Sequence, residues 1–304
     1  MTTFIIHIVL LLTLPPLLPG VINKTKALFA GRRGPPLLQL YYDLFKLARK
    51  DMVISRVTTW IFTAAPVITL TTILAAGLLV PLGPFRAPIS FAGDMILFAY
   101  LLGLGRFFTT AAALDTGSPF EGMGAAREVT FACLSEPALF FAMLVLAKLS
   151  GSLELTTMLH APMTVGNPSS AASLVLVALG VFIIMLAETC RVPVDDPNTH
   201  LELTMIHEVM VLDHSGPLLG MILYGAALKL FVLSAVLLHI VFPFQTGSAL
   251  SDWALFVVEI LGVSVVIGVV ESIMARLQMR HVPHLLIAAI LLCGFGFVLL
   301  MRAS

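Results

Sequence analysis

Eight long apolar runs limit the folds available to this chain more than any other feature. Each approaches or exceeds the roughly 20 residues that an α-helix needs to cross a ~30 Å hydrocarbon core. The runs lie near residues 3–22, 57–81, 91–114, 129–149, 170–190, 217–243, 252–275 and 282–303. Only 11% of the residues are charged, whereas soluble domains are about one quarter charged. We therefore predict an all-α, polytopic integral membrane protein with about eight transmembrane helices, forming a single domain over residues 1–304.

The distribution of lysine and arginine predicts the orientation of the chain, because positive charge in short connections stays on the cytoplasmic side of a membrane. Most cations fall on one side of the expected spans: Lys24, Lys26, Arg32, Arg33, Lys46, Arg49, Lys50, Arg56, Arg127, Arg191, Arg276 and Arg280. Arg86, Lys148 and Arg302 fall on the other side. We expect both termini to lie outside and the connection over residues 188–216 to face the cytoplasm.

Residues 36–55 predict a helix that lies on the membrane surface instead of crossing it. Their apolar side chains recur at three- and four-residue steps, which is typical of an amphipathic helix. Lys46, Arg49 and Lys50 form a polar face that suits the interface. Two roles stay open for this segment: a lipid anchor whose cations reach toward water, or a roof over a cavity.

Six ionisable residues fall within or at the ends of the predicted spans, and each is a candidate functional residue. On insertion scales a charge inside a membrane costs ~2.5–3.5 kcal/mol. The set comprises Arg106, Glu136, Glu188, Lys229, Glu259 and Glu271. Two cations among four carboxylates indicate a polar, hydrated path through which protons could pass. Static ion pairs that fix the register of the helices are the structural alternative.

The connection from Glu188 to Gly216 concentrates acidic residues next to lipid. Its carboxylates are Glu188, Asp195, Asp196, Glu202, Glu208 and Asp213. Thr199 and Glu202 form a T-x-x-E capping box, which predicts a short helix that runs to about Leu212. The three histidines of this segment recur every seven residues, roughly 10 Å apart on a helix, which is too far for one metal ion. We therefore predict no metal site, and no catalytic triad or nucleic-acid patch stands out elsewhere.

Four segments together resemble the membrane subunit that anchors the redox arm of complex I, known as subunit 1 or as the H subunit. The acidic connection contains A-E-x-x-R-x-P-x-D from Ala187, followed by E-L and then S-G. The other segments are GRRGPPLLQLYYDLFKLARK from Gly31, GRFFTTAAALDTGSPFEGMGAAREVTFACLSEP from Gly105 and ESIMARLQ from Glu271. These three look most similar to the hydrogenase branch of the family, which includes the membrane components of formate hydrogenlyase and hydrogenase-4.

The resemblance implies a non-catalytic subunit of a prokaryotic cytoplasmic (inner) membrane, which couples electron transfer to proton or sodium translocation. Its partners would be the large and small subunits of a hydrogenase and antiporter-like membrane subunits. The chain itself would bind no cofactor, because the iron–sulfur clusters and the nickel–iron centre would belong to the partners. The implied junction with the redox arm comprises Asp115, Glu121, Arg127, Glu128, Arg191, Asp195, Asp196, Glu202, Glu208 and Asp213.

Departures from the complex I pattern keep a second function open. Complex I relatives usually have Phe where this chain has Val194, and their EYSG is replaced here by the segment from Asp213 to Gly216. These changes favour a hydrogenase over a quinone reductase. The alternative is the quinone-site membrane subunit of an NADH-quinone oxidoreductase, and an independent ion transporter or an inert anchor forms a third class.

Overall fold

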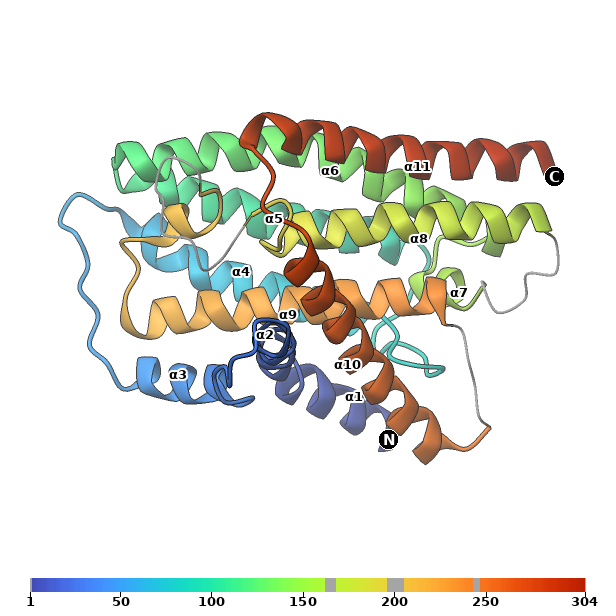
Figure 1. The fold of residues 1–304 in the computed structure, drawn as a ribbon, viewed down its shortest axis with the longest axis horizontal. Coiled ribbons are helices and arrows are strands. Elements are labelled where there is room, and N and C mark those ends of the chain that lie inside the picture. Colours follow the sequence, from blue (N-terminus) through green and yellow to red (C-terminus); the bar gives the residue numbers. More distant parts are fainter. Residues whose placement is uncertain (1, 162–167, 196–204, 243–246, 304) are drawn as a thin grey trace.

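The computed structural model describes residues 2–161, 168–195, 205–242 and 247–303, and within these residues every regular element is a helix. The helices are α1 Thr2–Thr13, α2 Leu17–Phe29, α3 Gln39–Ala48, α4 Trp60–Leu79, α5 Asp94–Asp115, α6 Pro119–Ser150, α7 Leu155–His160, α8 Pro168–Glu188, the 3₁₀ helix η2 Glu208–Val211, α9 Gly216–Val241, α10 Ala249–Ile273, the 3₁₀ helix η3 Met279–His281 and α11 Val282–Ala303. Helices α6, α8, α9 and α11 run alongside one another, and α10 crosses them obliquely (Figure 1).

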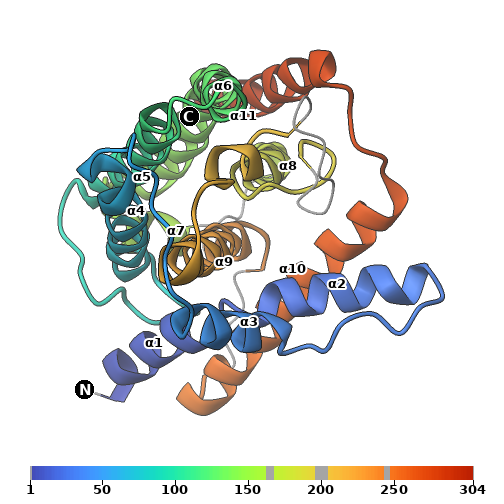
Figure 2. The same ribbon diagram turned by 90° about the vertical axis from the view of Figure 1, so that its left-hand side faces the viewer.

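The spans agree with the apolar runs of the sequence. Among the described residues, seven helices are long and apolar enough to cross a membrane, and the bent pair α1–α2 makes an eighth. Viewed along the bundle, α8 and α9 lie inside a ring formed by the other helices (Figure 2). They are also the spans with the largest buried share. The prediction of an all-α, polytopic membrane protein is confirmed.

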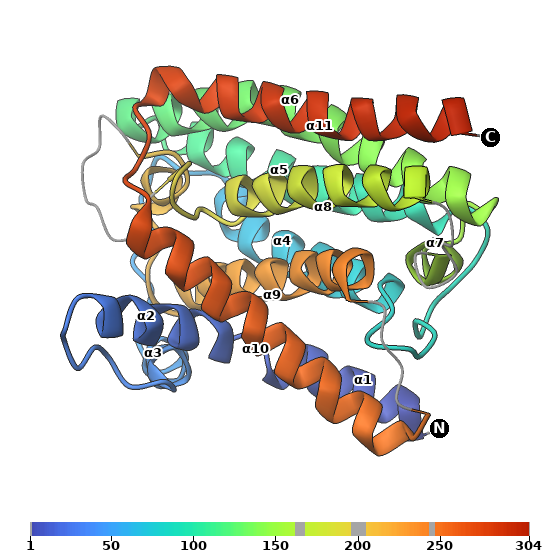
Figure 3. The same ribbon diagram turned by 45° about the vertical axis from the view of Figure 1, so that its right-hand side comes forward.

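The connections at one end of the bundle bring together segments that are far apart in the sequence. The end of α5, the start of α6, the end of α8, η2 and the start of α9 all meet there (Figure 1). The two termini lie at the opposite end, with α7 (Figure 3). We call the first end the loop end of the bundle.

The first apolar run does not form one straight helix. Pro15 and Pro16 divide it into α1 and α2, which are bent by 50°. Pro16 has no N–H, so the Leu12 carbonyl loses its helical partner, and Tyr224 of α9 donates to that oxygen at 2.9 Å. At the bend the N–H of Leu17 bonds to Leu14 instead of Thr13, and Tyr41 of α3 donates to the Thr13 oxygen.

A second proline repeats this arrangement in α4. Pro66 lies inside the helix, so the carbonyl oxygen of Phe62 has no helical N–H. The Nε2 atom of His214 lies 3.3 Å from that oxygen, and the His214 ring stacks on the Phe62 ring with centroids 4.0 Å apart. The chain just before α9 is therefore pinned to a kink in α4.

Three boundaries differ from those predicted. Helix α6 begins at Pro119, well before the apolar run at 129, because Ser118 and Pro119 start a helix there. Gly124 lies inside this helix and allows close packing, since a Cβ atom on it would overlap the side chain of Val209. The amphipathic helix predicted over 36–55 is α3, which covers only Gln39–Ala48. The short helix α7 was not predicted.

We predict that Tyr224→Phe destabilises the protein by about 1 kcal/mol, because the Leu12 oxygen then loses its donor in an apolar setting. Thermal unfolding of the purified chain in detergent measures the change. Tyr100→Phe is the matched control, because Tyr100 is 71% exposed on α5. Equal midpoints for the two variants would show that the broken helix does not need the Tyr224 hydroxyl.

Candidate functional site

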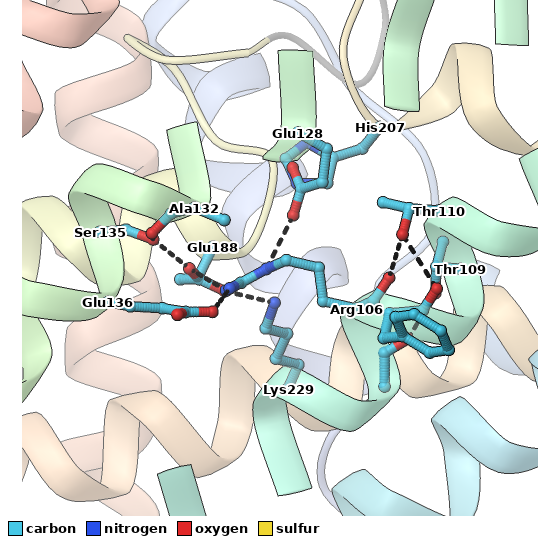
Figure 4. Close-up of polar contacts among 12 residues, drawn as sticks. Arg106, Thr109, Thr110, Glu128, Ala132, Ser135, Glu136, Glu188, His207 and Lys229 are labelled. Carbon is cyan, nitrogen blue, oxygen red and sulfur yellow. Dashed lines mark hydrogen bonds and ion pairs between the residues drawn. The ribbon is translucent and has the colours of Figure 1, made fainter. Parts of the chain in front are cut away.

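Arg106 of α5 is the centre of a buried ion-pair network. Its Nε donates to Glu128 of α6 at 3.1 Å, and its Nη2 donates to Glu188 at the end of α8 at 2.5 Å. Its Nη1 pairs with Glu136, about two helical turns further along α6. The side chains of Arg106, Glu128 and Glu188 are at most 10% exposed. One guanidinium thus joins three carboxylates from two helices (Figure 4).

Lys229 of α9 adds a second cation on the far side of Glu188. Its Nζ lies 2.6 Å from Oε2 of Glu188, and the Ser135 hydroxyl donates to Oε1 at 2.7 Å. Glu188 therefore accepts from Arg106, Lys229 and Ser135 (Figure 4). Charge-assisted hydrogen bonds of this kind offset the cost of removing a carboxylate from water.

His207 extends the network from the helices into the connection at the loop end. Its Nε2 lies 3.0 Å from Glu128, and its Nδ1 lies 3.5 Å from Asp195. Asp195 in turn pairs with Arg276, which follows α10, at 3.0 Å. The ion pairs therefore run without a break from Arg276 through Asp195 and His207 to the Arg106 centre.

The ion pairs centred on Arg106 and Asp195 carry one excess negative charge when His207 is neutral. Their carboxylates are Glu128, Glu136, Glu188 and Asp195, and their permanent cations are Arg106, Lys229 and Arg276. Four negative charges against three positive charges leave one negative charge. An imidazolium at His207 removes that excess, which favours the charged form of the ring.

The pKa values of the loop residues follow from the same contacts. Burial lowers the pKa of His207, but Cys190, Glu128 and Asp195 outweigh it and raise the pKa well above the usual 6.5. Burial raises the pKa of Asp195, but the hydrogen bond and charge of His207 outweigh it, and the pKa ends below its usual value. Both groups are therefore held in their charged forms.

Carboxylates also explain why the predicted helix over Thr199–Leu212 is wrong in its described part. Between 205 and 212 the only helix is the single 3₁₀ turn η2. Asp195 accepts from the backbone N–H groups of Ile206 and His207, at 3.1 and 3.2 Å. Glu121 accepts from the N–H of Asp213 at 3.0 Å. Asp195 therefore takes two N–H groups that an α-helix would use internally, and Glu121 takes the N–H of the residue that follows the predicted helix.

Glu271 of α10 belongs to a second buried cluster. It pairs with Lys26 of α2 at 2.7 Å and with Arg191 at 3.4 Å. Arg191 and Asp195 lie in one turn, since the N–H of Asp195 bonds to the Arg191 carbonyl at 3.2 Å. Through Arg191 and Asp195, this turn therefore forms ion pairs with Glu271 near the end of α10 and with Arg276 just after it. The two clusters contact each other through this turn, and the second cluster, with two cations and one carboxylate, offsets the excess negative charge of the first.

The remaining residues of the predicted set are distributed around these clusters. Glu259 lies on α10 with no ion pair among the described residues, so the structure does not bring it to the Arg106 network. Asp115 accepts from the N–H of Thr59 at 2.7 Å, and Arg127 donates to the carbonyl of Met205 at 2.8 Å. Asp213 is exposed. Asp196 and Glu202 lie outside the described residues.

A cavity of about 290 Å³ opens beside the network at the loop end. Apolar residues, chiefly from α4, α5 and α9, line most of it, and Leu40 of the amphipathic helix and Pro66 of α4 are among them. Its charged wall contains both cations and carboxylates: Arg106, Lys229, His207, Arg191, Glu128, Glu188 and Glu208. Thr69 and Thr109 also line the cavity, and their hydroxyl oxygens lie 3.2 Å apart.

No set of three or more His, Cys, Asp or Glu side chains in the described part of the chain is arranged to hold a metal ion. The His207 cluster contains one imidazole, two carboxylates and the thiol of Cys190, but cations and backbone N–H groups occupy the carboxylates. The arrangement suits the movement or storage of charge.

The fold and this network define a polytopic membrane protein in which an ion-pair path connects the loop end to the interior of the bundle. The sequence matches the NADH dehydrogenase family over residues 1–302, and the chain belongs to that family.

Relatives of high similarity are membrane subunits of hydrogenase complexes and of complex I. Formate hydrogenlyase subunit 4 of Escherichia coli K12 is 29% identical, over 99% of this chain and 97% of its own. Hydrogenase-4 component C of the same strain is 30% identical, over 91% of this chain and 88% of its own. The H subunit of the NADH-quinone oxidoreductase of Anaplasma phagocytophilum is 30% identical, over 71% of this chain and 68% of its own.

A solved structure shares the fold. A chain of the membrane-bound sulfane sulfur reductase, an archaeal respiratory membrane complex, matches 99% of this chain and 100% of its own with a TM-score of 0.83. At 21% identity this likeness concerns the fold alone. The relatives thus confirm the resemblance found in the motifs and place the chain among multi-pass subunits of membrane complexes.

The raised pKa of His207 gives a pH test of the network. The imidazolium contributes its full stabilisation below the unfolded pKa, near 6.5, and this contribution is lost as the pH rises through the higher folded pKa. We predict that His207→Gln costs about 1–2 kcal/mol at pH 6 and less at pH 9, measured by thermal unfolding in detergent.

His214→Gln provides the control of opposite sign. Burial lowers the pKa of His214, so its contribution grows as the pH rises. A His207→Gln effect that is the same at both pH values would show that the ring is neutral in the folded protein.

Proposed function

We propose that this chain is the membrane subunit of an energy-converting hydrogenase complex, which anchors a soluble redox arm and couples its electron transfer to proton or sodium translocation. The near-complete match to two hydrogenase membrane subunits supports the hydrogenase branch. The unbroken ion-pair path from Asp195 to Lys229 is the observation that carries the coupling role.

The path has the features that charge coupling requires. At its outer end, Asp195 and His207 sit in the connection that would face a docked arm. A change of charge there would shift the balance of the His207 proton between Asp195 and Glu128, which lie 3.5 and 3.0 Å from the ring. Glu128 and Glu188 both pair with Arg106, so a change of charge at one carboxylate alters the electrostatic potential at the other.

The inner end of the path leads to the side of the bundle. The Glu136 side chain is 49% exposed, whereas that of Glu188 is 7% exposed. A carboxylate that reaches the outer surface of this chain suits charge exchange with a neighbouring membrane subunit. We propose antiporter-like subunits as those neighbours, and the large and small hydrogenase subunits, with their iron–sulfur clusters and nickel–iron centre, as the arm.

The charge distribution supports an orientation for this assembly. Three of the cations predicted to face the cytoplasm lie at or beside the loop end: Arg127 is near the start of α6, Arg191 follows α8, and Arg276 pairs with Asp195 of the same connection. We propose that the loop end faces the cytoplasm of a prokaryotic cell and that both termini face outward across the cytoplasmic (inner) membrane.

We predict that Asp195→Asn lowers ion translocation per electron at least about fivefold in the reconstituted complex, because it removes the charge that holds His207 and Arg276. Hydrogen evolution and the recovery of all subunits should stay near wild type. Proton uptake into proteoliposomes, with hydrogen measured in parallel, provides the ratio.

Asp213→Asn is the control, because Asp213 is an exposed acid of the same connection whose side chain lies outside the network. Wild-type translocation in an assembled Asp195→Asn complex would remove support for the coupling role. An equal loss in both variants would point to docking through general loop charge.

A second candidate function is a quinone-site subunit, and the cavity is the observation that favours it. The cavity joins an apolar wall, including Leu40 and Pro66, to the cations Arg106 and Lys229. Such a combination fits a molecule with an apolar body and a carbonyl head group. A membrane subunit of an NADH-quinone oxidoreductase is among the relatives.

Photoaffinity labelling of the purified complex with a quinone analogue separates the two functions. For the hydrogenase we expect no competable labelling of residues that line the cavity, and hydrogen evolution without added quinone. Competable labelling of Leu40 or its neighbours, together with quinone-dependent turnover, would establish the second candidate instead.

A further inference from the structure

The amphipathic helix α3 has two apolar faces, and the bundle uses only one. The inner face carries Leu40, which lines the cavity, and Leu47, which packs near Gly220 of α9. The outer face carries Leu38, Tyr42 and Phe45 at one-turn spacing, and these side chains are 46%, 60% and 60% exposed. This ridge of three large side chains has no neighbour within the described chain to cover it.

Three cations lie next to this ridge. Lys46, Arg49 and Lys50 all lie exposed at the end of α3, and the Arg49 guanidinium sits 4.0 Å above the ring of Phe45. The only acid of the helix, Asp43, already accepts from Gln39 at 2.9 Å. We call the ridge and these three cations the α3 outer face.

The surrounding segment strengthens this positive charge. Residues 24–56 contain eight cations and two acids, a net charge of +6, in a chain whose total charge is zero. The eight cations are Lys24, Lys26, Arg32, Arg33, Lys46, Arg49, Lys50 and Arg56, and the acids are Asp43 and Asp51. Lys26 pairs with Glu271, but Lys46, Arg49 and Lys50, at and just after the end of α3, have no ion pair in the described structure.

We propose that the α3 outer face binds an anionic phospholipid, with acyl chains along Leu38, Tyr42 and Phe45 and the head-group phosphate among Lys46, Arg49 and Lys50. Helices that combine an apolar face with cations at its edge bind the boundary between head groups and acyl chains. An acidic soluble protein could satisfy the cations, but it would leave less reason for an aromatic and aliphatic ridge at membrane level. The lipid satisfies both halves of the surface at once.

Tryptophan quenching by brominated phospholipids tests this site in the full chain. The reporter is Phe45→Trp, which keeps a ring beneath Arg49, in a background where Trp60 and Trp253 are replaced by Phe. Brominated phosphatidylglycerol and brominated phosphatidylcholine are compared in proteoliposomes. We expect the reporter to favour the anionic lipid about fivefold or more, because each cation near an anionic surface adds roughly that factor.

A second reporter separates a local site from a general preference of the protein. Phe295→Trp on α11 is the matched control, because Phe295 is 61% exposed and lies in the middle of a span. It should show no preference. Raising the salt concentration should weaken the preference at position 45 without any further substitution. Neutralising Lys46, Arg49 and Lys50 with glutamine should reduce it to about one.

Equal quenching by the two lipids at position 45 would overturn the proposal. So would a preference that is equally strong at position 295, or one that persists in high salt. The salt titration uses folded protein with all its cations, so a failure of the triple variant to fold leaves the test intact. None of these results depends on hydrogen evolution or ion translocation.

Discussion

The rest of this structure depends on the ion pairs that Arg106 forms with three carboxylates inside the bundle. A guanidinium has five N–H donors in a fixed plane, so a single side chain can serve Glu128, Glu136 and Glu188 at once. Lysine could not reproduce this geometry. Because α5, α6 and α8 all contribute to the cluster, their positions at this level are fixed together, and Lys229 adds α9. Removing the arginine would leave several uncompensated charges in an apolar setting, which costs about 3–5 kcal/mol for one broken buried pair.

Prolines in two spans leave backbone carbonyls that need other donors. Pro16 and Pro66 free the carbonyls of Leu12 and Phe62, and side chains from distant elements, Tyr224 and His214, satisfy them. Irregular backbone at membrane depth survives only when it is buried in protein or lines a polar space. Pro66 and His214 both line the cavity, so the proline of α4 and the side chain that satisfies its freed carbonyl belong to the wall of this space.

The sequence predicted most of the fold, because a membrane imposes a strong and local rule on hydropathy. It also identified Arg106, Glu136, Glu188 and Lys229 as unusual, since each charge within a span needs a reason. It did not identify His207 as the connection between Glu128 and Asp195, because that link depends on three segments meeting in space. The regular seven-residue spacing of the histidines suggests a comparison as metal ligands, whereas His207 joins two carboxylates and His214 contacts the carbonyl of Phe62. The helix expected up to Leu212 failed for a similar reason: the distant carboxylate of Asp195 takes the backbone N–H groups of Ile206 and His207.

The composition of the network argues for a role beyond holding helices in register. Register could be fixed by apolar packing at no cost in desolvation, and buried ion pairs are often no more stabilising than the hydrophobic residues that could replace them. Here a titratable ring lies between two carboxylates, and its proton changes the charge of the Arg106 network. A static clamp has no need of a titratable ring at that position. A path that contains such a ring will respond to charge that arrives at its outer end, and its other end already reaches the side of the bundle at Glu136.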